Sequence, residues 1–171
     1  EQAANTNPEV VRALVEMAYE SGAKKVIVMD NTCITAERTY ERSGIKEAAD
    51  KAGADVRFVD ENRLTLYDFK GEKVQKWPVF RDFLEVDTFI NAPVLKHHSS
   101  AMLTIGMKNL YGILGGPRGK LHRNMGTGIA DLAAGFTVDL TIVDATRIML
   151  RNGPTGGSLA DVQEKQTIIG S

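Results

Sequence analysis

The sequence predicts an α/β fold, a three-layer domain with a mainly parallel sheet, helices on both faces and a β-hairpin insertion. Two observations indicate this fold: short apolar strands alternate with helical patterns along the chain, and such alternation forms βαβ units with a parallel sheet. The strands are also continuous apolar runs, as burial on both faces requires. The 171 residues suit a single domain over 1–171,. Because the sequence opens without an initiator Met, we expect it to be a fragment of a longer chain,.

Capping residues, glycines and hydrophobic periodicity define the expected elements. Asn7-Pro8-Glu9 is typical of a helix start, and Gly22 is typical of a helix end,. The predicted elements are helices at 8–22, 35–51 (broken at Ser43-Gly44), 101–111 and 129–136; strands at 24–29, 55–59, 86–91 and 139–143; a polar hairpin inserted at 61–80; and a final hairpin between 147 and 169,.

Composition excludes several classes of protein. The 21 basic and 22 acidic residues give a net charge of −1, so we expect no nucleic-acid partner and no binding to a membrane surface. The single cysteine, Cys33, allows no internal disulfide and no cysteine-ligated cluster from this chain alone,. No apolar run has the roughly 20 residues of a membrane span. We therefore expect a cytoplasmic location, with an export signal on a missing segment left open.

Polar residues stand at the ends of the predicted strands. Asp30-Asn31, Asp60, Asn91 and Asp144 each follow an apolar strand. The carboxyl ends of parallel strands share one edge, where open α/β sheets bind their ligands. Lys96-His97-His98 comes shortly after Asn91 and is expected to lie over the same edge. The alternative is that each acid or amide only caps the helix that follows it.

Two adjacent histidines, His97 and His98, raise the question of a metal site. Neighbouring side chains of an extended segment point to opposite faces, so one metal ion binds both only with strain. Further ligands would have to come from His122, Asp30 or Asp144,. The interpretation we favour is that one histidine faces the ligand as acid, base or anion contact while the other packs or binds the backbone. The metal therefore stays unknown.

Lys108 lies on the predicted helix at 101–111, which is apolar nearly all round and hence expected to be buried,. Its ammonium must then reach solvent, pair with a carboxylate such as Asp131 or Asp30, or meet a ligand. The more specific hypothesis is a desolvated lysine that contacts an anionic substrate, or acts as a base with a lowered pKa.

The segment 112–120 is rich in glycine and carries two cations, Arg118 and Lys120. Glycines such as Gly115 and Gly116 allow backbone N–H groups to approach an oxyanion closely. The spacing is neither that of a phosphate-binding loop nor that of a dinucleotide fingerprint. A mobile lid is the competing interpretation, and it is compatible with anion binding.

Several stretches together resemble a known bacterial and archaeal family over nearly the whole chain. They are Asn5–Glu9, Gly22–Val26, Pro93–His98, Thr104–Gly112 and Asp144–Arg147. The family is catalogued as domain of unknown function 362. Its members often carry a ferredoxin-like cysteine region, which is absent from these residues. A more remote similarity is to lactate racemase, in which lysine and histidine beside a glycine-rich segment face an anionic nickel cofactor; its spacing assigns no ligand here.

These observations predict a binding or catalytic domain for a small carboxylate or phosphate at the C-terminal edge of the sheet. The candidate catalytic residues are His97, His98 and Lys108, and the candidate ligand-binding residues are Lys96, Asn109, Gly115, Gly116, Arg118, Lys120, Asp30, Asn31 and Asp144. The alternative is a non-catalytic module that docks an iron–sulfur or other redox partner, such as a ferredoxin-like protein, or a cofactor-bearing domain. The substrate, the reaction and any cofactor stay open.

Overall fold

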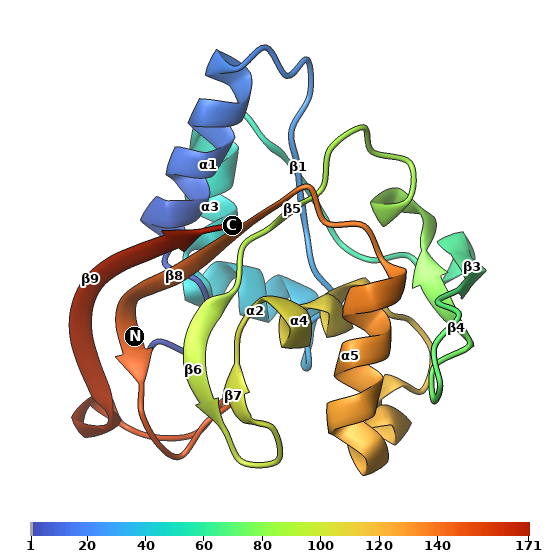
Figure 1. The fold of residues 1–171 in the computed structure, drawn as a ribbon. Coiled ribbons are helices and arrows are strands. Elements are labelled where there is room, and N and C mark those ends of the chain that lie inside the picture. Colours follow the sequence, from blue (N-terminus) through green and yellow to red (C-terminus); the bar gives the residue numbers. More distant parts are fainter. Residues whose placement is uncertain (1) are drawn as a thin grey trace.

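The computed structural model describes residues 2–171 and shows an α/β fold in which helices and short strands alternate (Figure 1). In this part of the chain the α-helices are α1 (Pro8–Glu20), α2 (Ala36–Ser43), α3 (Ile45–Lys51), α4 (Gly106–Asn109) and α5 (Met125–Gly135). The 3₁₀ helices are η1 (Glu61–Arg63), η2 (Arg81–Phe83), η3 (Leu110–Ile113), η4 (Arg118–Asn124) and η5 (Leu159–Asp161). The strands are β1 (Ile27–Met29), β2 (Asp55–Arg57), β3 (Leu64–Asp68), β4 (Lys76–Phe80), β5 (Ile90–Asn91), β6 (Val94–His98), β7 (Met102–Thr104), β8 (Leu140–Met149) and β9 (Val162–Gly170).

Local signals set the ends of the N-terminal helices. The Asn7 side chain accepts a hydrogen bond of 3.0 Å from the Glu9 N–H and so caps α1,. Gly44 separates α2 from α3 with a left-handed backbone, φ 76°, which glycine adopts without steric cost. The predicted helix after Pro8 and the predicted break near Ser43-Gly44 are both confirmed.

Strand β8 is the centre of the largest sheet. It pairs in parallel with β5 and β6 and antiparallel with β9, while β7 pairs antiparallel with β6. Strands β8 and β9 form a long curved ribbon at one side of the molecule (Figure 1). Strands β1 and β2 form a separate parallel pair. This mixture of parallel and antiparallel pairs with helices around them is the α/β class that the sequence predicts.

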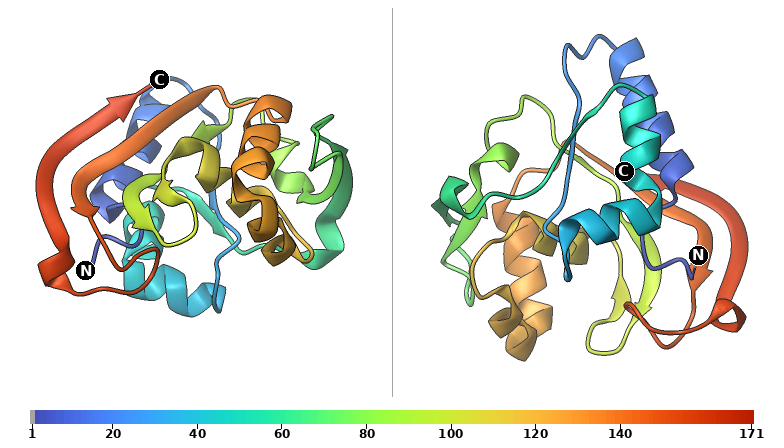
Figure 2. Two further views of the ribbon diagram at one scale, coloured as in Figure 1. Left: turned by 60° about the horizontal axis from the view of Figure 1, so that its bottom comes forward. Right: turned by 180° about the vertical axis from the view of Figure 1, so that it is seen from behind.

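Two hydrophobic clusters stabilise the fold. Helices α1 and α3 pack on the β1–β2 pair through Val11, Val15 and Ala49. Helix α5 and η3 pack against the β3–β4 hairpin in a larger cluster that includes Leu114 and Leu132, both fully buried. Burial of each such side chain contributes about 1.5–3 kcal/mol. Helices α1 and α3 lie at the opposite end of the molecule from α5, also when it is seen from behind (Figure 2).

The hairpin inserted at 61–80 is confirmed, with β3 and β4 paired antiparallel. Its second strand, β4, begins at Lys76. The reason is a contact from α5: the Asp131 carboxylate accepts hydrogen bonds from the N–H groups of Glu72, Lys73 and Val74 at 3.1, 2.7 and 2.9 Å. These residues therefore form the turn of the hairpin and not its return strand.

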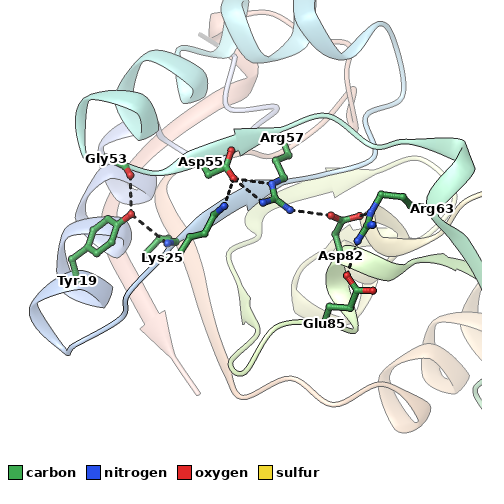
Figure 3. A network of polar contacts seen from close by, with 9 residues as sticks. Tyr19, Lys25, Gly53, Asp55, Arg57, Arg63, Asp82 and Glu85 are labelled. Carbon is green, nitrogen blue, oxygen red and sulfur yellow. Dashed lines mark hydrogen bonds and ion pairs between the residues drawn. The ribbon is translucent and has the colours of Figure 1, made fainter.

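Ion pairs join the hairpin region to strand β2 (Figure 3). The buried Asp82 accepts hydrogen bonds from Arg57 Nη1 at 3.1 Å and from Arg63 Nε at 2.8 Å. Arg57 also contacts Asp55, which pairs with Lys25 at 2.8 Å. Because Asp82 has two cationic partners, its carboxylate pKa is lowered although burial opposes this shift,.

Three sequence-based predictions of secondary structure are wrong. Residues 101–111 form β7, α4 and η3 instead of one helix, because β7 pairs with β6. The predicted strand at 86–91 is reduced to β5, since the Phe89 N–H donates to the Asp139 carboxylate at 2.7 Å and not to a strand. Strand β8 continues to Met149, so Asp144 lies in the middle of a strand rather than at its end.

Candidate functional site

Strand β6 presents Lys96 and His98 on one face and His97 on the other, as alternation along a strand requires,. His97 Nδ1 accepts a hydrogen bond of 3.1 Å from the Gly153 N–H. His98 Nδ1 instead accepts from the N–H groups of Ser100 and Ala101, at 3.1 and 3.2 Å. The His97 imidazole therefore holds the loop at Gly153, whereas the His98 imidazole holds the turn between β6 and β7.

Four elements bring charged groups together where β1 ends. Lys96 of β6 interacts electrostatically with Asp30 and Cys33. Lys108 of α4 interacts with Cys33, Arg118 and Lys96, and Arg118 of η4 interacts with Asp30. The end of β1 lies beside the segment that contains α4 and η3 (Figures 1 and 2), and the Asn31 N–H donates to the Gly112 carbonyl at 3.0 Å. We call Lys96, Lys108 and Arg118 the cation cluster.

Burial lowers the pKa of both lysines in the cation cluster. Desolvation lowers the pKa of Lys108 to about 8, and the positive charges of Arg118 and Lys96 add to this effect while Cys33 opposes it,. The Lys108 ammonium lies 3.6 Å from the centroid of the Tyr111 ring, a cation–π contact,. Desolvation also lowers the pKa of Lys96, whose ammonium donates to the Ala4 carbonyl.

Asp30 supplies a carboxylate beside these cations. Asp30 as a whole residue is exposed, but protein atoms surround its carboxyl group closely and the resulting desolvation raises its pKa; the charges of Arg118 and Lys96 act in the opposite direction,. A Cβ at position 112 would lie 2.0 Å from Asp30 Oδ1, so glycine is required there. Asp30 is thus fixed against η3.

The loop that follows β1 is held in place from two sides. Asn31 Nδ2 donates to the Leu114 carbonyl at 2.8 Å. Arg118 donates from Nη2 to the Thr32 carbonyl at 2.8 Å and from Nη1 to the Tyr111 carbonyl at 2.9 Å. Arg118 therefore positions the loop that carries Cys33, and only part of its donor capacity is used in doing so.

Three buried hydroxyl groups in residues 2–171 have no hydrogen-bond partner, and all three belong to residues next to the charged groups. Tyr40, 4% exposed, lies near the Asp30 backbone without forming a well-shaped hydrogen bond, and burial together with the Asp30 charge raises its pKa. Thr104, 6% exposed, stands directly opposite Lys96 in the β6–β7 pairing. Tyr111, 5% exposed, lies beneath the Lys108 ammonium. Buried polar groups are nearly always satisfied, and an unmade hydrogen bond costs about 1–3 kcal/mol.

His98 is buried and stacks against His122, with ring centroids 6.2 Å apart. Desolvation lowers its pKa to about 4, and the charges of Lys108, His122 and Lys96 contribute further. At neutral pH the ring is therefore uncharged, and because Nδ1 accepts two N–H groups we assign the proton to Nε2,. His98 is a neutral hydrogen-bond donor near the cation cluster.

The other predicted site residues lie against structural partners. A Cβ on Gly115 would lie 2.2 Å from Leu64 Cδ2, and Gly116 has a left-handed φ of 61° beside Pro78. Both glycines therefore allow the close packing of the hairpin on this segment. Lys120 is exposed on η4.

Asn91, Asn109 and Asp144 connect elements of the fold. Asn109 Nδ2 donates to Asn91 Oδ1 at 2.9 Å, which ties α4 to β5. The Asp144 carboxylate, 2% exposed, accepts from the Asn7 N–H at 2.7 Å and from the Thr146 N–H at 2.9 Å. It therefore joins the start of α1 to β8. Of the residues predicted at strand ends, only Asp30 lies among the cation cluster, while the Asp60 side chain caps η1.

The described residues offer no ready metal centre. Nowhere within residues 2–171 do three or more His, Cys, Asp or Glu side chains gather closely enough to hold a metal ion. Asp131 does not pair with Lys108, because its carboxylate accepts the N–H groups of the hairpin turn. A shallow hollow of about 610 Å³ lies on the hairpin between Asp68 and Trp77, and it contains none of the predicted site residues.

Cys33 is the residue that reasoning from the sequence missed. It entered only as a reason to exclude disulfides, yet the structure places its exposed thiol within electrostatic reach of Lys96 and Lys108. The available signal was its position three residues after Asp30, at the carboxyl end of a parallel strand,.

The fold and the site define an α/β domain with a cation cluster beside the end of β1. The chain belongs to the family described as Domain of unknown function (DUF362), whose model matches residues 1–171. A thylakoid-associated protein of Synechocystis sp. is 27% identical over 165 residues, which cover 92% of this chain and 50% of that protein. The chain thus spans about half the length of this curated relative. Within residues 2–171, no helix combines the length and hydropathy that a bilayer crossing requires.

Proposed function

We propose that this domain binds, and acts on, a small anion bearing a carboxylate or phosphate beside the cation cluster. The observation that carries the proposal is the coincidence of three cations with the three unpartnered buried hydroxyls, which belong to Tyr40, Thr104 and Tyr111. Cations without a full set of carboxylate partners favour an anionic ligand, and unpartnered hydroxyls favour a ligand that supplies hydrogen-bonding atoms.

The charge and hydrogen bonds of each side chain determine whether it contacts the anion or transfers a proton. At pH 7 a lysine with a pKa of about 8 is mostly protonated, so Lys108 contacts the anion and also holds a proton that it can transfer,. His98 donates from Nε2, whereas His97 already accepts the Gly153 N–H with its Nδ1. We therefore assign proton transfer to Lys108 and His98 rather than to His97.

Binding of inorganic phosphate and of acetate tests the proposal by calorimetry or by amide chemical shifts. Lys108→Ala is expected to weaken binding by about tenfold or more, the loss of one charge-assisted hydrogen bond. Lys24→Ala is the matched control, because Lys24 is exposed before β1, at the end opposite Asp30. Equal affinities of Lys108→Ala and the unaltered chain, or shifts confined to other surfaces, would refute the proposal.

A second candidate is the docking of an iron–sulfur or other redox partner, or of a cofactor-bearing domain. The observation in its favour is a set of exposed apolar side chains on β7 and α4: Met102 at 81%, Leu103 at 47% and Met107 at 52%,. Met107→Glu is expected to abolish shifts of these residues on addition of a ferredoxin while leaving phosphate binding intact. An absence of ferredoxin-induced shifts in the unaltered chain would contradict docking.

A further inference from the structure

Basic and acidic residues are distributed unevenly along the chain. Residues 88–130 contain five lysines and arginines and all three histidines, but no aspartate or glutamate. The net charge of −1 therefore averages one strongly basic stretch with an acidic remainder,. The basic stretch forms the elements from β5 to η4 and the first half of α5. Two of its cations, Lys120 and Arg123, are exposed on η4.

These two cations lie on the same side of η4. Side chains three positions apart lie one above the other in a 3₁₀ helix, while Leu121 between them is buried. Among the ion pairs of residues 2–171, none includes Lys120 or Arg123. Their charge is therefore not neutralised by a carboxylate and is available to an anionic surface.

The turn between β6 and β7 holds two apolar side chains in solvent. Met102 is 81% exposed and Leu103 is 47% exposed. Met102 has a left-handed backbone, φ 61°, which is uncommon for a residue other than glycine. The turn is fixed by the Leu103 N–H, which donates to the Ala101 carbonyl at 2.7 Å, and by the His98 Nδ1 acceptor. The fold therefore keeps a strained apolar tip away from its own core.

The apolar tip and the basic η4 lie side by side. His98, at the end of β6, stacks on the exposed His122 of η4 with ring centroids 6.2 Å apart. The turn between β6 and β7 and the start of α5, which follows η4, both lie at the bottom of Figure 1 and come forward in the left view of Figure 2. We call the following residues the basic–apolar face: Met102, Leu103, Lys120 and Arg123.

We infer that the basic–apolar face docks on the surface of a membrane that contains anionic lipids. The cations of η4 contact the lipid phosphates, and the apolar tip enters the boundary between headgroups and acyl chains. Docking of this kind needs no helix that crosses the bilayer. The inference goes beyond the proposed function, because the basic–apolar face contains no residue of the cation cluster.

Other occupants match this face less well than a bilayer does. A second copy docked through the same face would bring like charges together. Nucleic acid would use the cations and leave Met102 and Leu103 without a partner. A protein partner anchors its side chains in pockets, whereas the two best-defined hollows in residues 2–171 lie elsewhere, at 68–77 and 41–51. A bilayer accepts a protruding apolar tip without a pocket.

Co-sedimentation of the full chain with lipid vesicles tests the inference. One set of vesicles is phosphatidylcholine alone, and the other is an equal mixture of phosphatidylcholine and phosphatidylglycerol. We expect the partition constant at low salt to be about tenfold or more higher for the anionic vesicles, because each basic side chain near an anionic surface contributes roughly fivefold. High salt should remove most of this preference.

Variants separate the contributions of charge and of apolar insertion. Lys120→Gln combined with Arg123→Gln should lower binding to the anionic vesicles about tenfold or more. Met102→Asn should lower it about threefold or more, since asparagine tolerates the left-handed backbone but does not favour the apolar boundary. Lys24→Gln and Met17→Gln are the matched controls, because both residues are exposed and lie outside the face, and they should bind like the unaltered chain.

Equal partition onto neutral and anionic vesicles would overturn the inference. Anionic binding that is unchanged in both the double charge variant and Met102→Asn would do the same, and circular dichroism shows whether each variant is folded. Shifts of the tip residues by a ferredoxin without any vesicle binding would assign this face to a protein partner instead.

Phosphate binding by the same chains separates this inference from the proposed function. Lys108→Ala should lose affinity for inorganic phosphate and keep its binding to anionic vesicles. If the unaltered chain binds vesicles but no phosphate, the membrane surface stands and the proposed function fails. If Lys108→Ala loses vesicle binding while folded, the lipid phosphate is held by the cation cluster, and the assignment to the basic–apolar face is overturned.

Discussion

Replacement of Lys108 by methionine removes a charge from a half-buried position and keeps a side chain of similar length. Burial lowers the pKa of Lys108 from 10.5 to about 8, which corresponds to about 3 kcal/mol against the charged form at neutral pH. The cation–π contact with Tyr111, at 3.6 Å from the ring centroid, offsets about 1 kcal/mol of this penalty. We therefore expect Lys108→Met to increase the free energy of unfolding by about 1–2 kcal/mol at pH 7.

The stability difference between Lys108→Met and the unaltered chain should depend on pH with a definite sign. Below pH 8 the lysine is charged in both the folded and the unfolded chain, so the penalty is constant. Between pH 8 and 10.5 the folded chain releases the proton that the unfolded chain keeps, and the stability of the unaltered chain rises with pH,. The advantage of Lys108→Met should therefore shrink over this range.

Urea unfolding of the unaltered chain, Lys108→Met and the control Lys24→Met at pH 7 and at pH 10 measures this effect. The control should differ little from the unaltered chain at either pH, because Lys24 is exposed. A Lys108→Met chain less stable than the unaltered one at pH 7, or a difference that does not change with pH, would refute the reasoning. The confirmed result would also show that Lys108 is kept at a cost in stability, as expected for a functional residue.

Three further predictions concern the scaffold around the site. Asp131→Ala removes the acceptor of three backbone N–H groups and should lower the free energy of unfolding by about 1–3 kcal/mol, with loss of amide protection in the hairpin turn as the direct measurement. Gly115→Ala forces a Cβ to within 2.2 Å of Leu64 Cδ2 and should lower the melting temperature, whereas Gly119→Ala, which has open space around its Cβ, should leave it nearly unchanged. The His98 imidazole should stay neutral until about pH 4 in an NMR titration. The free energy of unfolding should fall as the pH drops from 6.5 toward 4, because the unfolded chain binds the proton first,. A His98 titration near pH 6.5 would contradict the assigned burial.

Local signals were sufficient for the elements that local contacts define. The Asn7 cap, the Gly44 break and the inserted hairpin all follow from residues close in sequence, and all three are confirmed. The segment 101–111 has helical spacing of apolar residues but forms β7 because β6 offers a pairing edge, a contact that no local pattern encodes,. The same limit applies to Asp144, whose strand extends because it pairs with β6 and β9.

The candidate site was predictable as a set of residue types but not as a geometry. The alternation along an extended segment places His97 and His98 on opposite faces, and the lowered pKa of Lys108 agrees with its expected desolvation. Of the alternatives open for Lys108, the pair with Asp131 does not form, because Asp131 binds a turn from a distant part of the chain. The nearness of Cys33 to Lys96 and Lys108 depends on how β1, β6 and α4 pack in the fold, and the sequence pattern does not show this packing.

The hydrogen bond from the Lys96 ammonium to the Ala4 carbonyl affects how an anion can bind beside the cation cluster. An anion that draws this ammonium toward itself must compete with a backbone oxygen that precedes α1. Thr6 fastens the same stretch to the Ala92 carbonyl at 2.7 Å, so the stretch has a second anchor when the first is released. Anion binding at the cation cluster and loosening of residues 4–6 are then coupled. The amide exchange of those residues should therefore report on a ligand that they do not touch.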